Sequence, residues 1–427
     1  PESQKALCRA AVFAFPVTLE GFFAVSGSPQ ESMSALAGEW ANRAFVYRNP
    51  ERPTWTVYGL LRPWLLSKLS DEELKKAHKV AGDFLMEMEK KGRLNENGIF
   101  WLESLMEARS QYLQAGELDL ARDVNKQLSN IFVRSGFYGG VRRLNLELLQ
   151  YQEHPNPMHW IGRSYLDQGD YSSAQHWYQH CLSVSSALNS EKKVHEALAL
   201  NGLASIDLRK GDYKGAREKF EMLLKITQQM GFQAGEATAW HNLASIDINI
   251  GDCQAAQDKY EKAMKIRLRI GDRDGAAFTW NQLAIIDLEK GDHQAARVKF
   301  ENALNIFQQT GNLLGEASAW HNLATVDLER EGDYQAAQEK FENSMKIKQQ
   351  IGDRAGEAQT WHQLATIDFK KDDCQAARDK FKKALKIVQL IGDMEGEAAV
   401  FYQLGFLSWN EDYTQEGLRL MAISHLI

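Results

Sequence analysis

Residues 238–272 read TAWHNLASIDINIGDCQAAQDKYEKAMKIRLRIGD, and similar stretches recur at intervals of about 40 residues along the second half of the chain. The clearest marker is the dipeptide Gly-Asp, found at Gly169-Asp170, Gly211-Asp212, Gly251-Asp252, Gly291-Asp292 and Gly332-Asp333. Asp372-Asp373 continues the series without the glycine. A fixed period of this size predicts a solenoid, in which each repeat packs on its neighbours.

Each repeat is predicted to be a pair of helices. Apolar and small residues follow the i, i+3, i+4 spacing of a helix, as in Trp240, Leu243 and Ala244. The glycine of Gly-Asp suits a left-handed helix end, and the aspartate suits the cap of the next helix. We therefore expect helix–turn–helix hairpins in which large residues such as Trp240 and Tyr260 fill the space that small residues such as Ala256 leave.

The repeats resemble the tetratricopeptide repeat. The earliest clear copy has Met158 in the slot where this family usually has Trp, followed by Gly162, Tyr165, Gly169, Tyr171, Ala174 and Tyr178. Later copies resemble the 40-residue variety of Leu-Gly-Asn-repeat adaptors and bacterial regulatory ATPases, as in Ile270-Gly271-Asp272-Arg273. The resemblance covers residues 155–427, about six to seven repeats with the last truncated. It implies an all-α fold, a right-handed superhelical solenoid, which residues 96–154 precede as more degenerate hairpins.

The first 95 residues do not repeat and are predicted to form a small winged-helix domain and a linking helix. Residues 6–13, 18–24 and 28–44 favour three helices, and 45–47 and 55–58 favour two strands around a Pro-containing turn. A further helix is expected over 59–69. Ser70 with Glu73 then predicts a capping box that opens the linking helix.

This first domain resembles the winged-helix element of signal-transduction ATPases with numerous domains (STAND, NB-ARC-like). The similar stretches are Phe13-Ala14-Phe15-Pro16 and Val57-Tyr58-Gly59-Leu60-Leu61-Arg62. In the family a His of the second stretch approaches the nucleotide phosphate, whereas this chain has Tyr58 there and Gly59 in place of an Asp. That difference argues against direct nucleotide sensing. The resemblance implies an ATPase domain upstream of Pro1, and we expect the chain to be part of a longer protein.

Composition excludes several classes of function. The formal net charge is −7, which disfavours nucleic acid as a partner, since that requires a basic face. No run of 18 apolar residues is present, and four scattered cysteines suggest neither a disulfide framework nor a zinc site, so we expect a cytoplasmic protein. The chain has no phosphate-binding loop and no nucleophile signature, so we expect no enzyme activity and no cofactor within it. His241, His321 and His362 occupy one repeat position, with Asn281 in the same place between them, and they are too far apart to share a metal ion.

A polar stripe is predicted along the first helices of the hairpins. The spacing +4, +3, +4 places four residues of each helix on one face, away from Trp240 and Leu243. The stripe residues are Thr238, Asn242, Ser245 and Asn249; Phe278, Gln282, Ile285 and Glu289; Ser318, Asn322, Thr325 and Glu329; and Gln359, Gln363, Thr366 and Lys370. The second position is always an amide, including Gln403 in the last copy, and His241, His321, His362 and Tyr402 flank the stripe.

An amide both donates and accepts hydrogen bonds, so a ladder of amides is suited to holding an extended peptide backbone. The resemblance places these helices on the concave side, which makes the stripe the candidate peptide- or protein-binding groove. The alternatives are that the amides are merely tolerated on a wet helix face and that the histidines are solvated or line the groove.

A second recurrent pair is predicted to be structural. An Asp lies four residues after the Leu of each repeat, and a Lys recurs on the second helix. The pairs are Asp207 with Lys219, Asp247 with Lys259, Asp287 with Lys299, Asp327 with Lys340, and Asp368 with Lys380. Because a half-buried acid needs a donor, we expect each Asp to meet either this Lys or a Trp indole. A site for acidic ligands is the functional alternative.

Three functions follow from these patterns. The first is the sensor and regulatory arm of a signal-transduction ATPase, in which the repeats bind a protein or peptide and the winged helix relays occupancy. The second is a free-standing adaptor that holds extended peptides. The third is a transcription regulator that uses residues 28–44 to read DNA. Neither the ligand nor the oligomeric state follows from the sequence.

Overall fold

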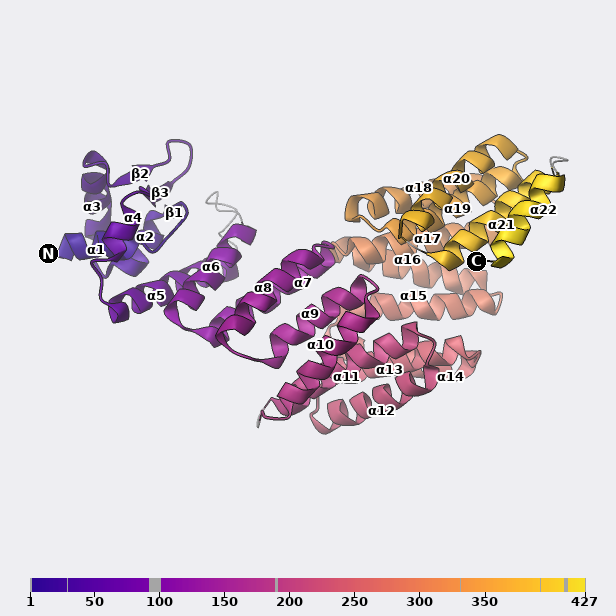
Figure 1. Cartoon of the computed structure of the whole chain (residues 1–427), viewed down its shortest axis with the longest axis horizontal. Helices are drawn as coiled ribbons and strands as arrows, with labels where there is room; N and C mark the ends of the chain where they lie inside the picture. The colour runs from indigo at the N-terminus through magenta and orange to yellow at the C-terminus, as the bar shows by residue number, and fades with distance from the viewer. Residues whose placement is uncertain are drawn as a thin grey trace. The chain divides into compact units, whose positions relative to one another are not determined.

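The chain is almost entirely helical in the computed structural model, which describes residues 2–28, 30–91, 101–188, 191–330, 332–391, 393–410 and 414–426. It divides into two compact units, Pro1–Gly202 and Leu203–Ile427. Consecutive helices pack as neighbours within each unit (Figure 1). In the described residues, no helix is long and apolar enough to cross a membrane.

The first unit begins with a winged-helix arrangement: helix, strand, two helices, two strands. The elements are α1 (Glu2–Ala10), β1 (Val17–Thr18), α2 (Leu19–Ser26), α3 (Gln30–Asn42), β2 (Val46–Arg48) and β3 (Thr54–Val57). The antiparallel sheet has the order β1-β3-β2, with Val17 opposite Trp55 and Val46 opposite Val57. This confirms the expected domain type. β1 was not predicted, because a strand of two residues is too short to show an alternating pattern.

Two helices connect this domain to the hairpins. The helix expected over 59–69 is the shorter α4 (Arg62–Leu66), which Pro63 helps to start because proline suits the first helical turn. The guanidinium of Arg62 donates to the carbonyls of Ala11 and Val12, which ties α4 to the chain after α1. α5 (Asp71–Lys90) opens with the capping box of Ser70 and Glu73, as predicted.

The rest of the first unit is a series of helices without a strict repeat. These are α6 (Trp101–Ala115), α7 (Leu118–Arg134), α8 (Tyr138–Tyr151), α9 (Pro155–Asp167), α10 (Tyr171–Ser185) and the start of α11 (Lys192–Arg209). A buried polar network joins α6, α7 and α8: Arg109 donates to Asn125 Oδ1 at 2.7 Å, and Asn125 donates to Asn145 Oδ1 at 2.8 Å. Buried polar groups satisfied in this way fix one register between helices.

The second unit continues with regular hairpins. Its helices are α12 (Tyr213–Gln229), α13 (Gln233–Asn249), α14 (Cys253–Ile270), α15 (Arg273–Glu289), α16 (His293–Thr310), α17 (Leu313–Arg330), α18 (Tyr334–Ile351), α19 (Arg354–Lys370), α20 (Cys374–Ile391), α21 (Met394–Asn410) and α22 (Thr414–Leu426). From α13 on, odd-numbered helices are the first and even-numbered helices the second of each pair (Figure 1). Tyr260 is fully buried in its pair, as predicted, and so are Phe300 and Phe341 at the equivalent positions.

The Gly-Asp turns have the predicted geometry. Gly251 and Gly291 adopt positive φ values of 85° and 80°, and the following aspartates accept the N–H three residues on, as Asp252 does from Ala255 at 3.0 Å. Asp372, which stands where the glycine is lost, adopts φ 62° all the same. The turn geometry is therefore kept at a cost in backbone strain.

Candidate functional site

The predicted stripe lies on the first helices with its amides half-buried. We call Asn242, Gln282, Asn322, Gln363 and Gln403 the amide stripe. The last stripe position on each helix is exposed, at Asn249, Glu289, Glu329 and Lys370. At 100° per residue, Asn242 lies on the side of α13 away from Asp247. The stripe face also makes packing contacts, because Phe278 and Ile285 of α15 pack against a buried core cluster and the ring of Phe278 lies 4.8 Å from that of Phe307.

The stripe hydroxyls bond within their own helices. The hydroxyls of Thr238, Ser245, Thr325 and Thr366 each lie within 3.2 Å of the carbonyl four residues earlier. Ser245 also lies 2.9 Å from the hydroxyl of Tyr260. These groups therefore contribute mainly acceptor capacity to the face.

The flanking histidines are half-buried and pack against aromatic rings. The rings of His241, His321 and His362 meet Tyr260, Phe341 and Phe381 edge-on, with centroids 5.0, 4.9 and 5.3 Å apart. Burial lowers the pKa of His241 and of His321 to about 3, and it lowers the pKa of His362 as well. Three neutral imidazoles are therefore packed into the edge of the stripe at neutral pH.

Tyr402 occupies the position of these histidines on α21, but it is more exposed than they are. Its side chain is 45% exposed, and Phe406 and Trp409 on the same face of α21 are 40% and 45% exposed. Phe369 of α19 meets Phe406 edge-on at 5.8 Å. The polar stripe thus gives way to aromatic side chains on α21.

The Asp–Lys prediction is confirmed at all five positions. Lys219 lies 2.6 Å from Asp207, Lys340 2.5 Å from Asp327 and Lys380 2.5 Å from Asp368, and the remaining two pairs are also in contact. The Trp indole is not the partner, since Trp240 Nε1 lies 3.4 Å from Glu236 instead. Because every pair joins the two helices of one hairpin, the ladder is structural.

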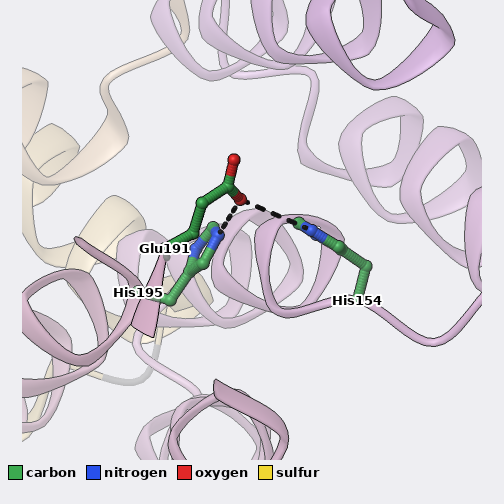
Figure 2. A group of neighbouring side chains, drawn as sticks. All are labelled: His154, Glu191 and His195. Carbon is green, nitrogen blue, oxygen red and sulfur yellow. Dashed lines mark hydrogen bonds and ion pairs between the residues drawn. The ribbon is translucent and has the colours of Figure 1, made fainter. Parts of the chain in front are cut away.

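His154, Glu191 and His195 form a cluster that was not predicted from the sequence (Figure 2). Glu191 Oε2 lies 3.3 Å from His195 Nε2 and 3.9 Å from His154 Nε2. Both rings are buried, and burial lowers the pKa of His154 to about 4 and lowers the pKa of His195. The i, i+4 spacing of Glu191 and His195 was the available signal.

Two histidines and a carboxylate are ligands that bind zinc in other proteins, but the hydrogen bonds of this cluster do not suit a bound metal ion. A metal-bound imidazole normally donates its other N–H to an acceptor. His154 Nδ1 instead accepts the backbone N–H of Asn156 at 3.2 Å, so its Nε2 carries the proton. The arrangement fits a carboxylate that is hydrogen-bonded to His195 Nε2 and lies near the N–H of His154, at the start of α9 and of α11.

An exposed apolar patch lies between β3 and α4. Leu60 is 97% exposed, Trp64 58% and Tyr58 43%. Tyr58 and Leu60 belong to the stretch 57–62 named above, whereas Trp64 follows it on α4, and exposed large apolar side chains commonly mark an interaction surface.

The chain is a helical-hairpin repeat protein. Its helix pairs have Gly-Asp turns, small and large side chains pack against one another at recurrent positions, and each first helix has a polar face. The tetratricopeptide repeat family model matches residues 154–229, 235–309 and 315–389. The chain therefore belongs to the tetratricopeptide repeat family. No curated protein matches its sequence.

Solved structures with the same fold are similar to this chain at low identity. A STAND protein with a tetratricopeptide repeat sensor from Pyrococcus horikoshii is 14% identical over 100% of this chain, with a TM-score of 0.73. This chain spans 62% of the length of that protein. NprR in complex with its cognate peptide NprX is 14% identical, with a TM-score of 0.50, and the match covers 69% of this chain and 88% of that one.

Proposed function

We propose that the repeats bind an extended peptide segment along the amide stripe. The observation that carries the proposal is an amide at one position of five successive first helices, half-buried and facing away from the Asp–Lys ladder. Neighbouring helices pack about 10 Å apart, and an extended chain advances about 3.3 Å per residue, so one amide meets about every third residue of a peptide. The similarity to a peptide-bound repeat protein, NprR, supports this reading.

We further propose that the chain is the sensor arm of a signal-transduction ATPase. The winged-helix domain precedes the repeats, and the STAND protein with a tetratricopeptide repeat sensor is similar in structure over the whole of this chain. Tyr58, Leu60 and Trp64 are exposed and give the winged-helix domain an apolar surface. The ATPase domain would contact this surface and respond there to ligand binding by the repeats. The alternative is a free-standing adaptor that binds extended peptides and transmits no signal to an ATPase.

The DNA-binding alternative has less support. Arg43 is the basic residue of the segment expected to read DNA, and its guanidinium lies 2.8 Å from Glu39, four residues earlier. A recognition helix needs free basic side chains for phosphate contacts. The charge of Arg43 is already balanced by its own segment.

The binding proposal is tested with a random 12-residue peptide library displayed on phage. The wild-type chain, an Asn242→Ala/Asn322→Ala variant and a Gln254→Ala/Gln335→Ala control are compared, the control carrying its lost amides on the second helices. We expect enrichment by wild type and control and its loss in the stripe variant at unchanged melting temperature. No enrichment by the wild-type chain rejects peptide binding.

Sequencing the gene upstream of the codon for Pro1 tests the proposal that the chain is the sensor arm of an ATPase. A phosphate-loop ATPase encoded in frame upstream of Pro1 supports the sensor arm. A stop codon followed by a start site directly before Pro1 rejects it and leaves the adaptor.

A further inference from the structure

Two cations are buried among the hairpins at equivalent positions. Arg267 near the end of α14 is 8% exposed, and Lys348 near the end of α18 is 5% exposed. In the described residues Lys348 has no carboxylate within ion-pair distance, and Arg267 has one weak contact, 3.8 Å between its Nε and Asp272. Lys348 is therefore removed from water without a carboxylate in ion-pair contact, and Arg267 with only this long one, which is costly unless something else compensates the two charges.

Both cations reach a threonine of the next first helix. Arg267 Nη1 donates to Thr279 Oγ1 at 2.7 Å and also to the carbonyl of Gly275. Lys348 Nζ donates to Thr360 Oγ1 at 3.0 Å. Neutral oxygens thus orient the cations but do not neutralise them.

Comparison of the repeats with one another shows that the fold does not need these charges. The positions equivalent to Arg267 and Lys348 in the other repeats hold Thr227, Phe307 and Val388. The positions equivalent to their threonine partners hold Ala239, Ala319 and Val400. The cation and its threonine therefore occur together in alternate repeats, and the same space is filled without charge in between.

Each cation lies behind a histidine at the edge of the amide stripe. Lys348 Nζ lies 3.5 Å from His321 Nδ1, and His241 Nδ1 lies 3.3 Å from Thr279 Oγ1. Lysine can only donate, so Lys348 makes Nδ1 of His321 the acceptor and leaves the proton on Nε2. In the described part of the chain, that Nε2 has no partner, and it is not closed off from solvent. Ser318, His321 and Thr325 follow the +3, +4 spacing, so the ring shares the face of the stripe.

We propose that the stripe contains two subsites for carboxylate side chains of the bound peptide, one at His241 and Arg267 and one at His321 and Lys348. The inference rests on the proposed peptide binding and adds the chemistry of the ligand. Two hairpins separate the subsites, a distance of roughly 20 Å, which an extended chain spans in about six residues. The ligand is thus a peptide with two acidic residues about six positions apart, whose charges compensate the buried cations.

The test extends the phage selection with an Arg267→Met/Lys348→Met variant and a matched Lys265→Met/Lys346→Met control. The control removes two exposed lysines from the same helices, two residues earlier. We expect wild type and control to enrich Asp or Glu at two positions about six apart. The buried-site variant should still enrich peptides but without the acidic pair, and it should bind a selected diacidic peptide roughly tenfold or more weakly.

The thermal melt separates a binding role from a structural one. Because Phe307 and Val388 fill the same space in other repeats, the buried-site variant is expected to melt at or above the wild-type temperature. A melt several degrees lower, or the same acidic pair selected by both proteins, overturns the inference. Peptides enriched without acidic residues overturn the subsites and leave peptide binding intact, whereas no enrichment at all overturns both.

Discussion

The guanidinium of Arg217 on α12 donates to Oδ1 of Asp247 on α13 at 2.7 Å, so a charged hydrogen bond joins one hairpin to the next. The other oxygen of Asp247 is held by Lys259 within its own hairpin. Arg297, Asp327 and Lys340 repeat the arrangement two hairpins later. Gln257 and Gln338 replace the arginine in the repeats between, so Asp287 and Asp368 have only their own lysine as an ion-pair partner in the described residues.

The first prediction concerns the unequal importance of these aspartates. Asp247→Ala leaves two cations beside a buried cavity and is expected to cost about 3 kcal/mol of unfolding free energy. Asp287→Ala, which removes a single and more exposed pair, is expected to cost about 1 kcal/mol. Urea unfolding followed by circular dichroism measures both. An Asp247→Ala protein as stable as wild type would refute the structural role of the ladder.

The second prediction concerns the turn that lost its glycine. Asp372 has φ 62°, and Asp373, not Asp372, caps the following helix by accepting from Ala376. Replacing Asp372 with glycine removes the steric cost of the left-handed conformation without losing a cap, so Asp372→Gly is expected to stabilise the chain by about 1 kcal/mol. The reverse change at an equivalent turn, Gly291→Asp, is expected to destabilise it by a similar amount. Equal melting temperatures for both variants and wild type would contradict the argument.

The parts of the fold that repeat were predictable because each is determined by residues close in sequence. Hairpins, Gly-Asp turns and Asp–Lys contacts follow from spacings of at most 13 residues within one unit. The Arg217–Asp247 link was not predicted, because it spans two hairpins and alternates between repeats. The burial of Arg267 and Lys348 was not predicted either, because a basic residue near a helix end looks the same in the sequence whether it is buried or solvated.

The candidate site was predictable as a face and less so as a set of contacts. The +4, +3, +4 spacing grouped the stripe residues on one helical face, but it did not show that Phe278 and Ile285 of that face pack against a buried core cluster. It did not show that His241 packs on Tyr260, because that contact depends on the distance between two helices. Whether the amides hold a ligand stays a prediction.

The third prediction is a loss of stability at mildly acidic pH. Burial lowers the pKa of His241 and of His321 to about 3, whereas an unfolded histidine titrates near 6.5. Below pH 6.5 the unfolded chain therefore binds more protons than the folded chain, so stability present above that pH is lost as pH falls towards 3. Both rings keep some contact with solvent. We therefore expect the two histidines together to lower the free energy of unfolding by on the order of 2 kcal/mol between pH 6.5 and pH 5.

The control for this pH dependence comes from the chain itself, because Asn281 occupies the same position of another repeat. A His241→Asn/His321→Asn variant cannot titrate at these positions and should show a flatter dependence of unfolding free energy on pH. Urea midpoints at pH 7, 6 and 5 measure the difference. Parallel curves for wild type and variant would show that other groups govern acid sensitivity.

The last prediction concerns why the amide stripe begins at Asn242. Gly202 on α11 stands at the equivalent position one repeat earlier, and a Cβ there would overlap the ring of the fully buried Tyr178 on α10. Gly162 on α9 approaches the same ring, with 3.1 Å from its Cβ position. Tyr178 thus occupies the space that an amide side chain would need.

Gly202→Ala is therefore expected to destabilise the chain by about 2 kcal/mol, because a buried ring must leave its position. Gly38, inside α3 with no atom near its Cβ position, provides the matched control. Gly38→Ala is expected to stabilise by about 0.5–1 kcal/mol, since alanine restricts the unfolded chain and favours helix. Thermal melts of the two variants should thus shift in opposite directions, and a Gly202→Ala protein that melts like wild type would mean that the ring yields freely and does not set the limit of the stripe.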